Sequence, residues 1–138
     1  MTESNDQGQL SATEQASVGL EVARKLTERT LAGDVDGVAA LYHQDAVCWR
    51  NFDDRELAKP QVLKVIRLLG QSVRDLRYEE LRVQATARGF VQQHVMRGIA
   101  PSGQELRVAA CLVATLDGGL IRRLDEYLDS KALAPLLG

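Results

Sequence analysis

Sulfur and imidazole ligands are scarce in this sequence. Its 138 residues include only two cysteines, Cys48 and Cys111, and two histidines, His43 and His94. A zinc site made of Cys and His ligands would need nearly all of them, and the cysteines lack the short spacing of such sites. We therefore expect no metal, and we interpret the cysteines as reduced, buried thiols rather than as a disulfide.

A strong net charge, long apolar runs and phosphate-binding motifs are also lacking. The formal net charge is −2, with basic and acidic residues interspersed, which argues against a nucleic-acid partner. No stretch approaches the roughly 20 apolar residues that cross a bilayer, and the first dozen residues have no apolar core. No Gly-rich phosphate loop and no nucleophile elbow occurs. These absences predict a cytoplasmic protein that uses no cofactor and binds neither nucleic acid nor membranes.

The composition is that of one ordinary globular domain. Hydrophobic residues make up 45% and charged residues 26% of the chain, and its length is the commonest for a single domain. The polar residues 1–12 predict a disordered tail, which leaves 13–138 as one folded domain.

In the first half of the sequence, apolar residues recur every three to four positions, as they do along one face of a helix. Ser11 and Glu14 resemble a capping box, Asp34 is suited to cap a second helix, and Pro60 to open a third. We expect helices over 11–33, 35–42 and 60–70, with a strand at 46–51 and an acidic loop at 53–56 between the second and third.

Beyond Val73 apolar residues recur at every second position, which is the spacing of a strand with one buried face. We expect strands over 80–87, 90–98, 106–116 and 120–129, then a short helix or tail over 131–137. The third of these strands is apolar on both faces after Arg107, so it should be central. Helices followed by hairpin-linked strands predict an α+β fold, in which a curved antiparallel sheet closes as a cone over three helices of the N-terminal half. The open end of the cone is the expected ligand site.

The last strand carries an acid among leucines. Glu126 lies between Leu124 and Leu128 on one face, and burial there would raise its pKa into the range of a general acid or base. A salt bridge to Arg122 or Arg107 is the alternative explanation. The expected members of the same face are Leu120, Arg122, Leu124, Glu126 and Leu128. The opposite face should hold Ile121, Arg123, Asp125, Tyr127 and Asp129.

A histidine lies among apolar neighbours in the second of the hairpin-linked strands. His94 shares a face with Phe90, Gln92 and Met96, so we expect its imidazole to point inward. Glu126 on a neighbouring strand could orient it as a proton shuttle. A satisfied core histidine is the alternative interpretation.

The strand at 46–51 brings the only tryptophan and an amide to one face. Trp49 would form a pocket wall that stacks on a ligand, and Asn51 would hold a ligand oxygen or a water. Core packing is the alternative for Trp49. Tyr42, Met96 and Leu124 are further candidates for the pocket lining, although core packing fits them equally well.

Two stretches resemble the nuclear transport factor 2-like superfamily. LAGDVDGVAALYHQDAV, residues 31–47, resembles its entry through two helices into the first strand. DGGLIRRLDEYLDSKALAPL, residues 117–136, resembles its last hairpin, especially in SnoaL-like polyketide cyclases and limonene epoxide hydrolase. The resemblance spans residues 14–137 and implies the cone-shaped fold shared with ketosteroid isomerases, an apolar pocket and a homodimer.

Site residues follow from the resemblance one at a time. The epoxide hydrolases carry a Tyr-x-Asn motif on the first strand. In this chain Asn51 corresponds to its asparagine, but Trp49 stands where the tyrosine would be. The acid in their last strand corresponds to Glu126. Their Arg-x-Asp pair is missing from the strand of His94, which makes an epoxide hydrolase less favoured. The aspartate base of the steroid isomerases would fall near Arg50 or Asn51, where no acid occurs.

The sequence thus predicts a cofactor-independent acid–base enzyme. Its reaction would be cyclisation, isomerisation, hydration or dehydration of a small apolar oxygenated molecule such as a polyketide, terpenoid or steroid, with Glu126 and His94 as the acid–base pair. The alternative is a non-catalytic domain of the same fold that binds a small molecule or dimerises through an outer sheet face bearing Arg123, Asp125 and Tyr127.

Overall fold

The helical first half of the chain forms as its capping residues predict. The computed structural model describes residues 10–137, so residues 1–9 of the predicted tail lie outside the described part. Helix α1 (Ala12–Leu31) begins with the predicted capping box, in which the N–H of Glu14 donates to Ser11 Oγ and the N–H of Ser11 to Glu14 Oε1. Helix α2 (Val35–Ala39) is capped by Asp34, which accepts a hydrogen bond from the N–H of Gly37.

Helix α2 is shorter than predicted, and a strand occupies the expected acidic loop. Tyr42 begins strand β1 (Tyr42–Arg50) rather than ending the helix. Strand β2 (Arg55–Ala58) pairs antiparallel with β1, where residues 53–56 were expected to form a loop. Helix α3 (Lys59–Ser72) follows directly, with Pro60 in its first turn.

The second half is a series of hairpin-linked strands, as predicted, although the first of them covers residues 74–85 instead of 80–87. These are β3 (Arg74–Ala85), β4 (Gly89–Ile99), β5 (Glu105–Asp117) and β6 (Leu120–Leu128), followed by the short helix α4 (Ala134–Leu137). The six strands form one sheet in the order β2-β1-β6-β5-β4-β3, so β5 lies inside the sheet as expected. Every neighbouring pair is antiparallel except β1 and β6, which run parallel. The α+β fold with a curved, mostly antiparallel sheet is therefore confirmed.

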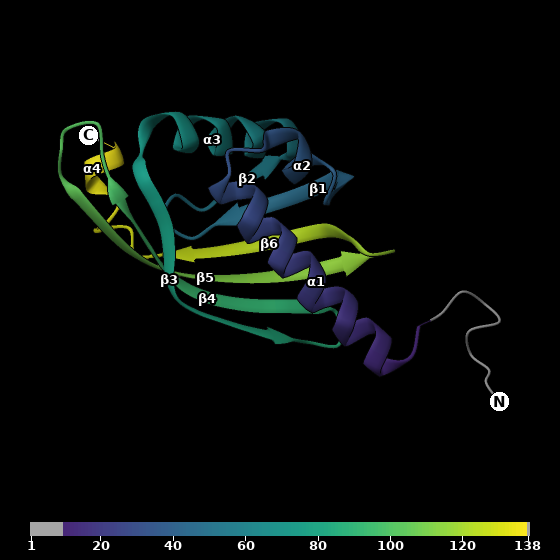
Figure 1. Cartoon of the computed structure of the whole chain (residues 1–138). Coiled ribbons are helices and arrows are strands. Elements are labelled where there is room, and N and C mark those ends of the chain that lie inside the picture. The colour runs from purple at the N-terminus through teal and green to yellow at the C-terminus, as the bar shows by residue number, and fades with distance from the viewer. Residues whose placement is uncertain (1–9, 138) are drawn as a thin grey trace.

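Helices α1 and α3 pack on the same face of the sheet, which we call the inner face (Figure 1). The main core joins that face to both helices. Its buried members include Ala23 and Leu26 from α1, Val62 from α3, and Phe90, Leu112 and Leu124 from the sheet. A second cluster, around Val73, Met96 and Leu106, lies beneath Leu133 and Leu136 at the C-terminal end of the chain.

A bulge in β6 changes the faces predicted for its first residues. Leu116 pairs with Ile121 and Thr115 with Arg123, so Arg122 is an extra residue between two pairs. As a result Ile121 is fully buried and Leu120 is exposed, the reverse of the prediction. Beyond the bulge the alternation is as predicted, with Leu124 buried in the core.

Candidate active site

A hollow of about 90 Å³ lies between α1, α3 and the inner face of the sheet. Most of its wall is apolar, which suits a largely apolar ligand. The residues that line this inner hollow are Leu26, Thr30, Tyr42, Cys48, Arg50, Leu57, Val62, Val65, Ile66, Leu69, Tyr78, Leu112, Leu124 and Glu126. Three of the residues proposed from sequence are therefore brought together here: Glu126, Tyr42 and Leu124.

Glu126 lines the inner hollow, as its position between Leu124 and Leu128 predicted. Burial raises its pKa from 4.5 to about 6, and the positive charge of Arg50 opposes this rise. Its carboxylate has no hydrogen bond or ion pair within residues 10–137. An acid that is uncharged about half of the time near pH 6 can both take up and release a proton.

The salt bridges considered as an alternative role for Glu126 do not form. Arg122 Nη2 lies 2.8 Å from Asp117 Oδ2, and Arg107 Nη2 lies 3.6 Å from Glu80 Oε2. Both arginines are thus paired with other acids. Pairing with them does not explain why the half-buried Glu126 lines the hollow.

Arg50 is the site residue that the sequence prediction missed. It is the register partner of Glu126 across the parallel pair β1–β6, so both side chains project from the same face into the inner hollow. Its guanidinium forms an ion pair with Asp53 and lies 4.6 Å from the centre of the Phe52 ring. Ala46 and Cys48, small buried residues at i−4 and i−2, are the sequence signal that places Arg50 on the inner face.

Trp49 and Asn51 were expected in the pocket, and that prediction is wrong. Because Cys48 and Arg50 face inward, Trp49 lies on the outer face, where its ring meets Tyr127 edge-on with centroids 5.3 Å apart. Its indole N–H donates to Asp54 Oδ1 over 2.8 Å. Asn51 uses its whole amide on the backbone of Leu128, accepting from the N–H over 2.8 Å and donating to the carbonyl over 3.2 Å. Asn51 therefore ties the end of β1 to β6 and does not line the inner hollow.

Two phenols face the inner hollow beside Glu126. Tyr42 is buried, as its predicted lining role requires, although it lies on a strand instead of a helix. Tyr78 on β3 was not predicted. Burial, assisted by the nearby negative charge of Glu126, raises the pKa of both phenols. Both hydroxyls thus stay protonated and can donate hydrogen bonds to a ligand oxygen.

His94 is buried on the inner face, as predicted, but among the described residues its hydrogen bond is to Gln92 and not to Glu126. Its Nδ1 lies 3.1 Å from Nε2 of Gln92, whose side chain is in turn bonded to the hydroxyl of Thr27 on α1. Its ring stacks on Tyr78 with centroids 3.8 Å apart and planes 9° from parallel. His94 is therefore not a lining residue of the hollow, but it stacks on Tyr78, which is one. Met96 belongs to the second core cluster and does not line the hollow, contrary to the prediction.

Acid should weaken the fold through His94. Because burial lowers its pKa from 6.5 to about 4, the folded protein binds fewer protons than the unfolded chain between these values. The stabilisation that depends on neutral His94 is complete above pH 6.5 and is lost as the pH falls toward 4. Urea unfolding across this range should show a shallower loss of stability for His94→Gln than for the parent protein, and equal slopes would contradict the assignment.

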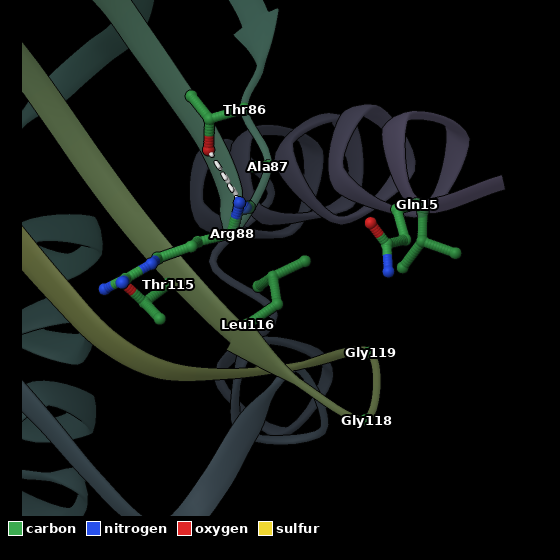
Figure 2. Close-up of a pocket in the computed structure, with 10 residues that line it drawn as sticks. Gln15, Thr86, Ala87, Arg88, Thr115, Leu116, Gly118 and Gly119 are labelled. Carbon is green, nitrogen blue, oxygen red and sulfur yellow. Dashed lines mark hydrogen bonds between the residues drawn. The ribbon is translucent and has the colours of Figure 1, made fainter. Parts of the chain in front are cut away.

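A larger hollow of about 420 Å³ lies at the end of the sheet near the start of α1. Figure 2 shows Gln15 on α1 above the turn of Gly118 and Gly119, with Arg88 extending toward Thr115. The nearby Thr86 hydroxyl is used by the turn itself, since it accepts hydrogen bonds from the N–H groups of Arg88 and Gly89. The described residues that line this turn hollow include no carboxylate and no imidazole.

Metal sites and membrane spans are lacking in the part of the chain that the structure describes. There, no three His, Cys, Asp or Glu side chains are grouped to hold a metal ion. No helix among the described residues is both long and apolar enough to span a membrane.

Comparisons with known proteins agree with this fold. The chain is similar to an NTF2-like protein from Burkholderia xenovorans, with 14% identity, a TM-score of 0.73, and coverage of 86% of this chain and 95% of that one. It is also similar to an LEH-like epoxide hydrolase from M. tuberculosis, with 17% identity, a TM-score of 0.70, and coverage of 88% and 91%. A third similar structure, from Jannaschia, is named a SnoaL-like polyketide cyclase and has 14% identity, a TM-score of 0.77, and coverage of 91% and 95%.

The sequence itself identifies the family. No curated protein sequence matches the chain. Residues 23–124, however, match the model of the SnoaL-like domain, and this stretch runs from α1 into β6 and includes most of the inner hollow. The chain therefore belongs to the SnoaL-like domain family.

Proposed function

We propose that the protein catalyses proton transfer on a small oxygenated molecule held in the inner hollow, without a bound cofactor. The observation that carries the proposal is one carboxyl group with a pKa near 6 that faces an apolar hollow and has no partner among the described residues. A general acid or base needs a pKa close to the working pH and access to its substrate, and Glu126 meets both requirements.

The reaction that this arrangement favours is removal or return of a proton next to a carbonyl group. The Glu126 carboxylate takes the proton as the carbon–hydrogen bond breaks, and the electron pair moves onto the carbonyl oxygen. Hydrogen bonds from Tyr42, Tyr78 or Arg50 would stabilise the negative charge on that oxygen. Return of the proton to another carbon completes an isomerisation. In a cyclisation the carbanion attacks a second carbonyl carbon, the electron pair of that C=O bond moves onto its oxygen, and Glu126 returns the proton to this oxygen.

His94 acts in this proposal as a positioning residue rather than as the partner of Glu126. Its hydrogen bond to Gln92 fixes the imidazole, and its stacking fixes the ring of Tyr78 beside the hollow. Leu124 and the other apolar residues of the hollow exclude water from the reacting atoms. Trp49, Asn51 and Met96 have no part in the site.

The size of the inner hollow favours a small substrate. About 90 Å³ is well below the roughly 300 Å³ at which pockets for drug-sized ligands begin. A polyketide, terpenoid or steroid would fit only if α3 moved away from the sheet. Epoxide hydrolysis with an asparagine-held water is disfavoured, because the Asn51 amide is used by the backbone of Leu128.

Deuterium exchange tests the proposal without knowledge of the natural substrate. Short-chain ketones, aldehydes and oxo acids would be incubated with the protein in D₂O, and the loss of hydrogens next to the carbonyl would be followed by proton NMR. We expect at least one compound to exchange faster than in buffer. Ligand binding without exchange by any compound would instead support a non-catalytic binding domain.

We further propose that the outer face of the sheet joins two copies of the chain. A groove of about 480 Å³ lies there, and small residues, Ala109 and Cys111, form part of its lining beside Tyr127, which is 45% exposed. A two-fold dimer needs a surface that complements itself, and a protruding ring next to a groove can provide one. Sedimentation equilibrium should give a dimer that Tyr127→Lys weakens, and a monomeric parent protein would contradict this.

A further inference from the structure

We propose that the ligand of the inner hollow carries a carboxylate group and that Arg50 binds this group. The inference rests on the proton-transfer function proposed above, because it concerns the same hollow, and it names the chemical class of the substrate. It depends on the geometry of Arg50 and on the polar groups around it.

Arg50 is held in place with one edge left for a ligand. Its Nε and Nη2 both donate to the carboxylate of Asp53, and its guanidinium lies over the Phe52 ring. The side chain is only 15% exposed. Nη1 has no acceptor among the residues that the structure describes. A guanidinium fixed in this way loses little freedom when it binds a further acceptor, and its planar edge matches a carboxylate.

The other polar groups of the inner hollow can mostly donate hydrogen bonds. Thr30, Tyr42 and Tyr78 each contribute a hydroxyl, which can donate or accept, and Glu126 contributes the only carboxylate among the described lining residues. A ligand that uses these donors together with Arg50 needs several acceptor atoms. A carboxylate has two oxygens with about four acceptor positions, more than a ketone or an alcohol offers.

Glu126 and a ligand carboxylate can occupy the hollow together if they share a proton. The charge of Arg50 is already balanced by Asp53, so the hollow has no surplus positive charge to hold two anions. Two carboxyl groups at one site normally retain one proton between them. When Glu126 holds this proton, it donates a hydrogen bond to the ligand carboxylate. When the ligand carboxylate holds it, Glu126 is ionised and can act as the base of the proposed reaction.

Matched four-carbon probes test the proposal on the whole protein. Butyrate and butyramide have nearly the same shape and differ in charge, and both are small enough for a hollow of about 90 Å³. Their affinities would be measured by NMR titration for the parent protein, for Arg50→Gln and for Arg50→Lys. Arg82→Gln is the control, because Arg82 is an exposed arginine on β3 that does not line the inner hollow.

We expect butyrate to bind at least about ten-fold more tightly than butyramide, as a hydrogen bond to a charged group predicts. Arg50→Gln should remove this difference, Arg50→Lys should retain part of it, and Arg82→Gln should leave it unchanged. Equal binding of the two probes, undiminished butyrate binding in a folded Arg50 variant, or no binding of butyrate would each overturn the proposal. If Arg50→Gln does not fold, Arg50→Lys decides the result.

The two proposals can fail separately. Deuterium exchange by neutral ketones but by no oxo acid would uphold proton transfer and overturn the carboxylate ligand. Arg50-dependent butyrate binding without exchange of any compound would uphold the ligand class and reject catalysis.

Discussion

Glu126→Gln is expected to slow proton transfer in the inner hollow by about 10²- to 10⁴-fold, the usual contribution of a general acid or base. Glutamine keeps the shape of the side chain but cannot take up a proton at neutral pH. The rate of deuterium exchange with the best compound of the screen measures the effect. Glu105→Gln is the matched control, because it makes the same change at an exposed position on β5.

The stability of Glu126→Gln separates a functional acid from a structural one. Since the folded pKa is raised from 4.5 to about 6, ionised Glu126 opposes folding, and the penalty grows as the pH rises through this range. Above pH 6 the glutamine variant should therefore be more stable than the parent by on the order of 1 kcal/mol. A marked loss of stability would show that the carboxylate has a structural partner.

Phe90→Ala is expected to cost about 3–5 kcal/mol of folding free energy, a large part of what a domain of this size possesses. Phe90 is completely buried in the main core. The surrounding structure cannot easily move in to fill the cavity, because α1 already contacts Gly89, the residue before Phe90, closely. A methyl group at Gly19 would come within 2.5 Å of the carbonyl oxygen of Gly89. Urea unfolding monitored by circular dichroism measures the loss.

Leu68→Ala on α3 is the control for this core variant. Leu68 is 50% exposed, so its truncation should change stability by no more than about 0.5 kcal/mol. Equal losses in Phe90→Ala and Leu68→Ala would contradict the placement of the main core between α1 and the sheet.

Most of the fold could be predicted from the sequence, because its periodic segments are long and its caps are specific. The capping box at Ser11 and the period of two beyond Val73 correctly predicted α1 and the four hairpin-linked strands. Strand β2 was missed because only one of its four residues, Leu57, is buried. A short, charged edge strand of this kind has no periodic signal and forms because β1 offers it a partner.

The first strand was assigned the wrong face, and this misplaced two of the five residues predicted to line the pocket, Trp49 and Asn51. Trp49 is the largest apolar residue in the segment, so burial favoured placing it inside. On the outer face its ring packs against Tyr127 and its indole N–H donates to Asp54, and neither contact can be predicted from the sequence of β1 alone. The alternative set, Cys48 and Arg50, was therefore missed, although its position follows once the register with β6 is known.

In β6 the sequence was informative on one side of the bulge only. Strict alternation correctly predicted that Leu124 and Glu126 face inward, but it failed for Leu120 and Ile121. Arg122 is an extra residue only in relation to its pairing with β5, and the sequence of β6 alone does not show where that pairing shifts.

The titration of Glu126 shows whether the inner hollow holds a carboxyl group suited to acid–base chemistry. Carbon-13 NMR of the Glu126 side-chain carboxyl, assigned by comparison with Glu126→Gln, would be followed through an acid titration. We expect a midpoint near 6, because the half-buried carboxyl group lies among the apolar residues of the inner hollow, where desolvation raises its pKa. A midpoint near 4.5, the ordinary value for glutamate, would show that the group is in contact with bulk water and would contradict the site.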